Sequence, residues 1–156
     1  MSAAPQPTPP HFRIVPAQEA HAAAIRQLVR AAGINPTGLA WERFLVALSA
    51  EDELIGCIQI KPHADGSREL ASLAVAPAWQ GRGLARALLE ALLAGNHGEL
   101  YLMCQSRLGP LYAKFGFQPV AAPDMPTYFR RVSKLAGVVL SLKKADEQLL
   151  VMWRPA

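Results

Sequence analysis

Between residues 73 and 85 the chain reads Leu73-Ala74-Val75-Ala76-Pro77-Ala78-Trp79-Gln80-Gly81-Arg82-Gly83-Leu84-Ala85. An apolar run, a turn of small residues and the start of an amphipathic run predict a strand, a glycine turn and a helix. The first N–H groups of a helix lack internal partners and, with the helix dipole, favour an anion. Gly81 and Gly83 carry no Cβ that would hold a phosphate away from the backbone. Nearby, Arg82 and Arg86 can add charge-assisted hydrogen bonds. The segment predicts an anion-binding turn, with a purely structural turn as the alternative.

Strands and helices follow one another on both sides of this turn. Before it, the apolar pattern predicts a helix around 25–32, a turn at 35–38, and strands at 12–15, 44–48, 54–60 and 70–75. The last three of these strands have short connections, which imply an antiparallel meander. After it, the pattern predicts helices at 84–92, 110–115 and 124–144, and strands at 100–104, 117–120 and 148–153. The order is that of a mixed α/β fold around one sheet.

Composition favours one folded domain. The chain has 156 residues, of which 51% are hydrophobic and 18% charged, so a sizeable core can form. The first ten residues hold four of the 13 prolines, and we expect 1–11 to be a flexible tail and 12–156 a single domain. The sequence has neither a signal peptide nor an apolar run of about 18 residues, so we expect a cytoplasmic protein. Cys57 and Cys104 lie in apolar runs without partners at metal-binding spacing, which predicts reduced, buried thiols and no metal site.

Two motifs together resemble the GCN5-related N-acetyltransferase (GNAT) family. The acetyl-coenzyme A signature of that family is Gln or Arg, two residues, Gly, one residue, then Gly or Ala, and Gln80, Gly83 and Ala85 match it. Downstream, the segment Leu111–Phe117 is similar to the family's Tyr-x-Lys-x-Gly-Phe segment. The resemblance covers about 12–121 and the last strand. It implies an α/β (α+β) GNAT fold, with a single mixed, mostly antiparallel sheet of about six to seven strands, helices on both faces and an extra helix before the last strand.

The resemblance also implies where acetyl-coenzyme A binds as co-substrate. In the family the fourth and fifth strands splay apart, and the pantetheine arm enters the gap between them. The implied contacts in this chain are the main chain of Leu73, Ala74 and Val75, the turn residues Gln80, Gly81, Arg82, Gly83, Leu84, Ala85 and Arg86, and the side chains of Gln105 and Tyr112. Gln105 stands where the family commonly has asparagine, and Gly109 with Pro110 is expected to delay the next helix.

For catalysis, the resemblance implies that Tyr112 is the general acid that protonates the leaving thiolate. The general base is less well marked, because the position where the family often has a carboxylate holds Ala71. Glu69 lies two residues earlier and therefore on the same face of the strand, either as the base or as a solvated charge at the strand end. His63 and His21 are alternatives, although a lone histidine near a turn is usually exposed.

The segment 124–144 lies outside the resemblance. Its apolar positions Tyr128, Val132, Leu135, Val139 and Leu142 form a helical stripe opposite the basic residues Arg130, Arg131, Lys134, Lys143 and Lys144. Plain packing on the sheet, a dimer surface, and a lid with Tyr128 and Phe129 near the acceptor channel all remain open. We expect an acetyl-coenzyme A dependent N-acetyltransferase that acts on an amine of unknown identity by direct attack.

Two other functions remain as alternatives. A non-catalytic acyl-coenzyme A sensor would keep the anion-binding turn without the base. An RNA-directed protein would use the net charge of +4 and the basic helix, but the sequence has no aromatic-interleaved binding motif. We expect no membrane or nucleic-acid partner, and a homodimer is a reasonable expectation.

Overall fold

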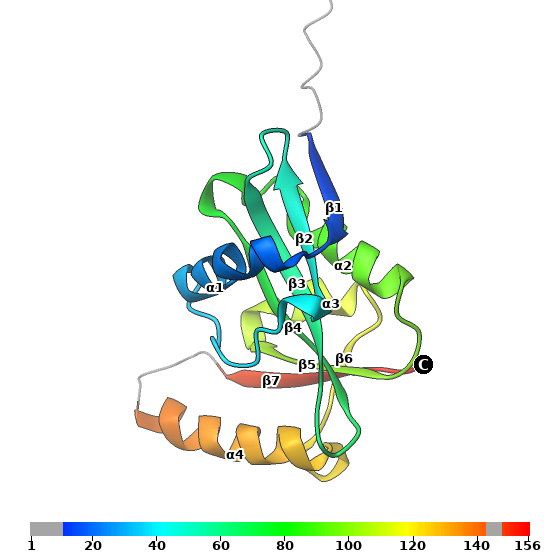
Figure 1. Ribbon diagram of the computed structural model, residues 1–156. Helices are drawn as coiled ribbons and strands as arrows, with labels where there is room; N and C mark the ends of the chain where they lie inside the picture. The colour runs from blue at the N-terminus through cyan, green and yellow to red at the C-terminus, as the bar shows by residue number, and fades with distance from the viewer. Residues whose placement is uncertain (1–10, 143–147) are drawn as a thin grey trace, which may run out of the picture.

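The structure, a computed structural model, describes residues 11–142 and 148–156, with side chains described for 11–135 and 148–156. The described residues form a seven-stranded sheet in the order β1-β2-β3-β4-β5-β7-β6 (Figure 1). The strands are β1 (Phe12–Pro16), β2 (Phe44–Ser49), β3 (Leu54–Pro62), β4 (Arg68–Val75), β5 (Leu100–Gln105), β6 (Gln118–Pro119) and β7 (Leu149–Arg154). All neighbouring strands are antiparallel except β4 and β5, which confirms the expected mixed sheet and its meander.

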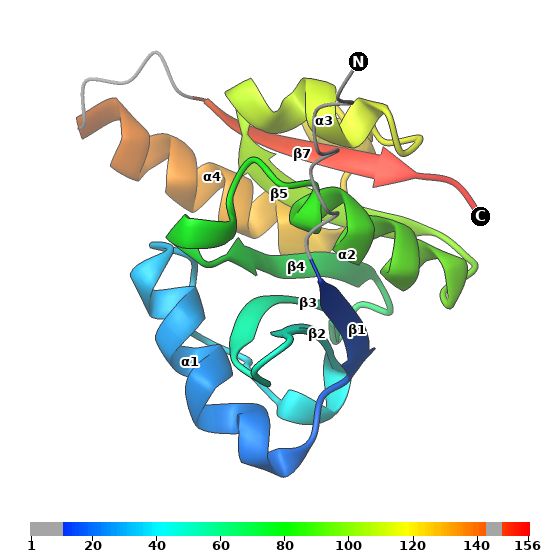
Figure 2. The same cartoon turned by 90° about the horizontal axis from the view of Figure 1, so that it is seen from above.

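Helices cover both faces of this sheet. Those in the described residues are α1 (Ala22–Ala31), α2 (Leu84–Ala94), α3 (Gly109–Ala113) and α4 (Thr127–Leu142). α1 and α2 lie on opposite sides of β4 (Figure 2). The apolar residues of α1 pack with Val46, Cys57 and Ala74, whereas α2 shares a core cluster with Tyr112 of α3. None of these helices has the length and hydropathy needed to cross a bilayer.

A β-bulge in β4 changes which side chains face each side of the sheet. Gln59 pairs with Ala71 but Cys57 pairs with Ala74, so β4 carries one extra residue between the two pairs. Ser72 lies in this bulge with a positive φ of 58°, which is uncommon outside glycine. Strict alternation along 69–75 is therefore broken, and Leu73 follows Leu70 onto the α2 side.

The parallel pair of β4 and β5 is short. Its register contains Glu69 opposite Tyr101, and no further pair joins the two strands in the described residues. Beyond this point the strands diverge, as the resemblance implies for the fourth and fifth strands. Backbone groups on the facing edges are therefore left without a sheet partner.

Three element boundaries differ from the sequence expectation. α3 begins at Gly109, one residue earlier than expected, after a 3₁₀ turn over Ser106–Leu108 that separates it from β5, and Pro110 is tolerated in its first turn. The predicted strand at 117–120 is reduced to Gln118–Pro119. The predicted helix at 124–144 begins only at Thr127, after a 3₁₀ turn that contains Asp124, and 143–147 lies outside the described residues.

The inward stripe of α4 also differs from the expected one. Phe129 is fully buried against Tyr101, with ring centroids 5.1 Å apart, whereas Leu135 is 68% exposed. Met125, just before the helix, completes this small core cluster with Val151 of β7. The helix runs out past the start of β7 (Figure 1), so its later turns leave the sheet.

We expect Phe129→Ala to lower the free energy of unfolding by about 3–5 kcal/mol, because it empties a fully buried site. Leu135→Ala on the same helix should change it by less than about 0.5 kcal/mol, because an exposed side chain away from other features contributes little. Urea unfolding followed by circular dichroism measures both. Similar losses for the two variants would contradict the packing of α4 described above.

Candidate functional site

A cavity of about 610 Å³ opens where β4 and β5 diverge. Its walls come from the β4 backbone, the end of β5, the residues after α1, and side chains of α3 and α4. The residues that line it are Ala32, Gly33, Ile34, Asn35, Lys61, Glu69, Leu70, Ala71, Ser72, Leu73, Ala74, Val75, Gln80, Met103, Cys104, Gln105, Arg107, Leu108, Tyr112, Val132 and Leu149. The structure thus brings most of the predicted site residues together around one cavity.

The glycine turn forms a cradle of free amides beside this cavity. Gly81 and Gly83 have φ values of 75° and 80°, and a Cβ built on either would meet nothing within 4 Å. In the described residues, no backbone acceptor is bonded by the amides from Gly81 to Arg86, and the N–H of Ala87 is the first to bond, to the carbonyl of Gly83. Open space, successive free N–H groups and the start of α2 together suit a diphosphate.

The three polar side chains of the turn have different partners in the structure. The Arg82 guanidinium lies 5.2 Å from the centroid of the Trp79 ring. Arg86 instead pairs with Glu90 on the outer face of α2, at 2.9 Å. The side-chain amide of Gln80 donates a hydrogen bond to the carbonyl of Val75 at 3.3 Å and so links the turn to the last residue of β4.

Tyr112 lies on α3 and lines the cavity. The residue is 7% exposed, and its ring packs edge-on against Phe117 with centroids 6.2 Å apart. Its hydroxyl has no hydrogen-bond partner in the described residues, and its oxygen is not among the fully buried unpaired atoms. Burial, with a smaller effect of Cys104, raises the pKa of Tyr112 to about 12. The phenol therefore carries its proton at neutral pH and can donate it into the cavity.

The wall beside Tyr112 belongs to β5. Cys104 is a free, buried thiol whose pKa is raised to about 11 by burial, so it is neutral at physiological pH. Cys57, the other free thiol, is buried in the α1 core. Gln105 is exposed at the cavity edge, and its side-chain oxygen accepts a hydrogen bond from Arg107 at 2.8 Å. Gln105 thus offers its amide N–H₂ group to a ligand.

Glu69 lines the cavity and is not the solvated charge that its place at a strand end allowed. It is 5% exposed, and its carboxylate lies 3.2 Å from Nε2 of His63. Burial raises the pKa of Glu69, and the His63 contact partly offsets that effect. The expectation of an exposed His63 is also wrong, because its side chain is 11% exposed and stacks on Tyr128 with ring centroids 3.5 Å apart.

The tip of the β3–β4 hairpin holds the start of α4. Asp65 accepts a hydrogen bond from the backbone N–H of Tyr128 at 3.0 Å, and another from its own neighbour Ser67. These bonds lower the pKa of Asp65 to about 2, and the bond from Ser67 has the largest effect. Neither Tyr128 nor Phe129 lines the cavity, as a lid there would require, and the α4 residue that does is Val132.

Lys61 stands beside Glu69 and was missed by the sequence analysis. It is 7% exposed, and its ammonium donates to the carbonyl of Thr37 at 2.7 Å. Gln59, on the same face of β3, donates to the next carbonyl, that of Gly38, at 3.1 Å. The segment after α1, of which 32–35 line the cavity, is thereby held against β3. The available sequence signal for Lys61 was its place two residues after Gln59 in an apolar strand, which puts the two polar side chains on one face.

Other predicted groups lie away from the cavity. His21 caps the 3₁₀ turn Glu19–His21 that precedes α1, where its Nδ1 accepts the backbone N–H of Gln18 at 2.9 Å, and it does not line the cavity. The basic residues Arg130, Arg131 and Lys134 are exposed on α4, while Lys143 and Lys144 lie outside the described residues. In the described ranges no group of three His, Cys, Asp or Glu side chains could hold a metal ion.

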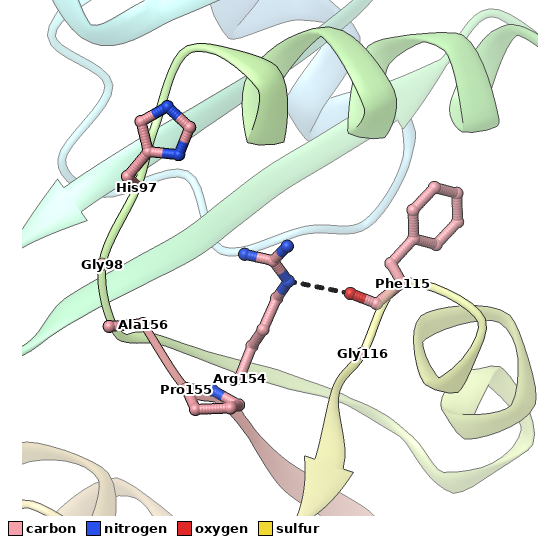
Figure 3. Close-up of a pocket in the computed structure, with 7 residues that line it drawn as sticks. All are labelled: His97, Gly98, Phe115, Gly116, Arg154, Pro155 and Ala156. Carbon is pink, nitrogen blue, oxygen red and sulfur yellow. Dashed lines mark hydrogen bonds between the residues drawn. The ribbon is translucent and has the colours of Figure 1, made fainter.

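A second hollow, of about 380 Å³, lies at the far end of β7. Arg154 crosses it and donates from Nε to the carbonyl of Phe115 at 2.9 Å, with His97 on the opposite side (Figure 3). Its lining contains no carboxylate side chain, tyrosine or cysteine. It offers no acid–base pair, so the chemistry is assigned to the cavity between β4 and β5.

Several solved structures share this fold. N-acetylglutamate synthase from Neisseria gonorrhoeae, complexed with coenzyme A and N-acetyl-glutamate, has a TM-score of 0.69 at 21% identity over 93% of this chain and 35% of that chain. Rv2747 from Mycobacterium tuberculosis, in complex with CoA, has a TM-score of 0.69 at 19% identity over 92% and 99%. A GNAT-family acetyltransferase from Staphylococcus aureus has a TM-score of 0.67 at 13% identity over 93% and 99%. This chain thus spans about a third of the synthase, and the likeness is one of fold.

The sequence itself carries the family assignment. No curated protein matches it significantly. A family model described as an acetyltransferase (GNAT) domain matches residues 40–119, about half of the chain. That range contains the meander, the glycine turn, the splayed strands and the tyrosine of α3. The chain therefore belongs to the GNAT family of acetyltransferases, whose co-substrate is acetyl-coenzyme A.

Proposed function

We propose that this protein transfers an acetyl group from acetyl-coenzyme A to an amine, with both substrates bound at once. The observation that carries the proposal is the joining of three features at one cavity. These are the free amides from Gly81 to Arg86, which follow the lining residue Gln80, and two lining residues, Tyr112 with its hydroxyl and Glu69 with its buried carboxylate. An anion cradle, an acid and a base around one cavity suit a thioester donor and an amine acceptor.

The residues present fit the co-substrate. The amides after Gly81 would hold its diphosphate, and the unpaired edge of β4 around Leu73 and Val75 would bond its pantetheine arm. A backbone N–H of that edge is also suited to stabilise the oxyanion that develops on the thioester carbonyl. Acetyl-coenzyme A supplies an acyl group activated by a thiolate leaving group.

Acid–base chemistry falls to two side chains of this protein. Glu69, acting directly or through a water molecule, takes a proton from the ammonium form of the acceptor. The free amine nitrogen then bonds to the thioester carbon, and the carbon–sulfur bond breaks as the tetrahedral intermediate collapses. Tyr112 donates its proton to the departing sulfur, and the acetylated amine loses its remaining extra proton. Alignment of the two substrates supplies much of the acceleration.

Binding of the co-substrate can be tested at Gly83. Wild-type protein should gain thermal stability with acetyl-coenzyme A, about 2.7 kcal/mol at 100 times the dissociation constant. Gly83→Ala should bind at least about tenfold more weakly, because its Cβ stands in the cradle and its positive φ costs a side chain about 1–2 kcal/mol. Differential scanning fluorimetry over a range of ligand concentrations measures both.

Gly66→Ala is the matched control. Gly66 has a φ of 86°, and a Cβ there also meets nothing within 4 Å, but it lies in the β3–β4 hairpin. This variant should lose similar intrinsic stability and keep its affinity for acetyl-coenzyme A. Absence of any ligand-induced shift in the wild type would overturn the proposal. A shift without release of free thiol from any amine tested would instead support the acyl-coenzyme A sensor.

A further inference from the structure

The cavity is lined by a buried cation, Lys61, that forms no salt bridge within the described residues. Lys61 is 7% exposed, and the bond from its ammonium to Thr37 has an uncharged carbonyl as acceptor. No carboxylate in the described residues lies within salt-bridge distance of Lys61. The nearest acidic group that affects it is Glu69, whose carboxylate contacts His63.

A buried charge of this kind is costly unless an opposite charge compensates it. Burial lowers the pKa of Lys61, and the field of Glu69 offsets only part of that effect. An ammonium has three N–H donors, of which the Thr37 carbonyl takes one. The remaining donors and the incompletely compensated charge belong to a residue that lines the cavity. An anionic group on a ligand would satisfy both.

Lys61 and Glu69 are direct partners across the β3–β4 ladder. Partners of this kind project to the same face of a sheet, with Cβ atoms about 5 Å apart. Both residues line the same cavity as Tyr112, the proposed acid. A cation and a carboxylate therefore stand side by side where the acceptor must bind. One small molecule that carries both charges can reach the two groups together.

We propose that the acceptor is an amino acid, with its carboxylate held by Lys61 and its amino group directed to Glu69. The inference rests on the proposed function and names the substrate class of the same site. Polyamines are disfavoured, because a second positive charge would lie near Lys61. Amines whose neighbouring carboxyl is blocked, such as amino-acid amides and internal residues of peptides, lose the ionic partner.

The test compares free L-amino acids with their α-amides, and adds spermidine as a polycationic amine. Release of free thiol from acetyl-coenzyme A measures kcat and KM for each acceptor. The free acids should be used at least about tenfold more efficiently than the amides, because a buried ion pair is lost with the amide. In Lys61→Met this preference should shrink towards one, mainly through a higher KM for the acids.

Loss of the Thr37 bond alone would affect acids and amides alike, so the ratio between them separates ionic recognition from a structural role. Lys134→Met removes an exposed charge from α4 and should leave the ratio unchanged. A binding measurement complements the kinetics: free amino acids, but not their amides, should further stabilise the complex with coenzyme A in thermal melts.

Three results would overturn the inference: equal use of acids and amides, a preference for spermidine, or a ratio unchanged in Lys61→Met. Failure of amino acids both to react and to stabilise the coenzyme A complex would also overturn it. Each of these leaves the proposed acetyl transfer standing as long as acetyl-coenzyme A binds. Absence of that binding would instead be the failure of the proposed function.

Discussion

Tyr112→Phe is expected to lower kcat by about 10²–10⁴-fold, the usual contribution of a positioned general acid. The variant keeps the ring that packs on Phe117 and removes only the hydroxyl, which has no partner in the described residues. Without that proton the thiolate must leave unprotonated or take its proton from water. Steady-state thiol release gives kcat, and thermal melts give the affinity for acetyl-coenzyme A, which should change little.

Tyr101→Phe is the matched control. Tyr101 is also buried, but its hydroxyl bonds to Glu99 at 3.3 Å and does not line the cavity. Its kcat should stay within about twofold of the wild type. The alkaline side of the pH profile adds a check: with a pKa of about 12, Tyr112 stays protonated at pH 10, so its ionisation causes no loss of rate up to there. Equal losses of kcat and of cosubstrate affinity would contradict the acid role and leave a structural one.

Glu69→Gln is expected to have the second large effect: it should lower kcat/KM by about 10²-fold or more near neutral pH. The carboxylate is the active form of a base, and burial raises its pKa, so the wild-type rate should rise with pH through a value above the usual range for glutamate. The groups that face it are Lys61 of β3, His63 just after that strand, and Tyr128 of α4. In the variant that acid limb should disappear, and the deficit should shrink at high pH, where more acceptor arrives as free amine.

His63→Gln distinguishes the two candidate bases. A glutamine can still donate a hydrogen bond to Glu69, so a modest loss of less than about tenfold is expected if His63 only positions the carboxylate. A loss as large as that of Glu69→Gln, with disappearance of the acid limb of the pH profile, would transfer the role to His63. Stabilisation by acetyl-coenzyme A should persist in both variants and serves as the check on folding.

The order of elements and the anion-binding turn were predictable because they depend on local chemistry. The strand–glycine–helix order at 73–85 needs only residue types and periodicity, and the short connections of β2 to β4 permit little besides a meander. The bulge at Ser72 has a weaker signal. Leu70 and Leu73 are three residues apart yet reach the same core cluster, which is the spacing that an extra residue in a strand produces.

Features that depend on distant partners were not predictable. Glu69 and His63 are a strand-end charge and a turn histidine in the sequence, and both are buried because Tyr128 of α4 closes over them. The same holds for α4, which has apolar residues on more than one stripe. Met125 and Phe129 are buried because they pack against Tyr101 and Val151, and the sequence of the helix alone does not indicate these partners.

The bond between Asp65 and the N–H of Tyr128 joins residues 63 positions apart in the chain. Exposed hairpin tips are ordinarily good places to insert a tag or to open new termini. Here the tip supplies a cap to a helix that lies much later in the chain and that shields the candidate base. Insertions or new termini at this loop would therefore disturb the active centre, unlike a single methyl group at Gly66, and a biosensor or fusion built on this protein should use a different surface.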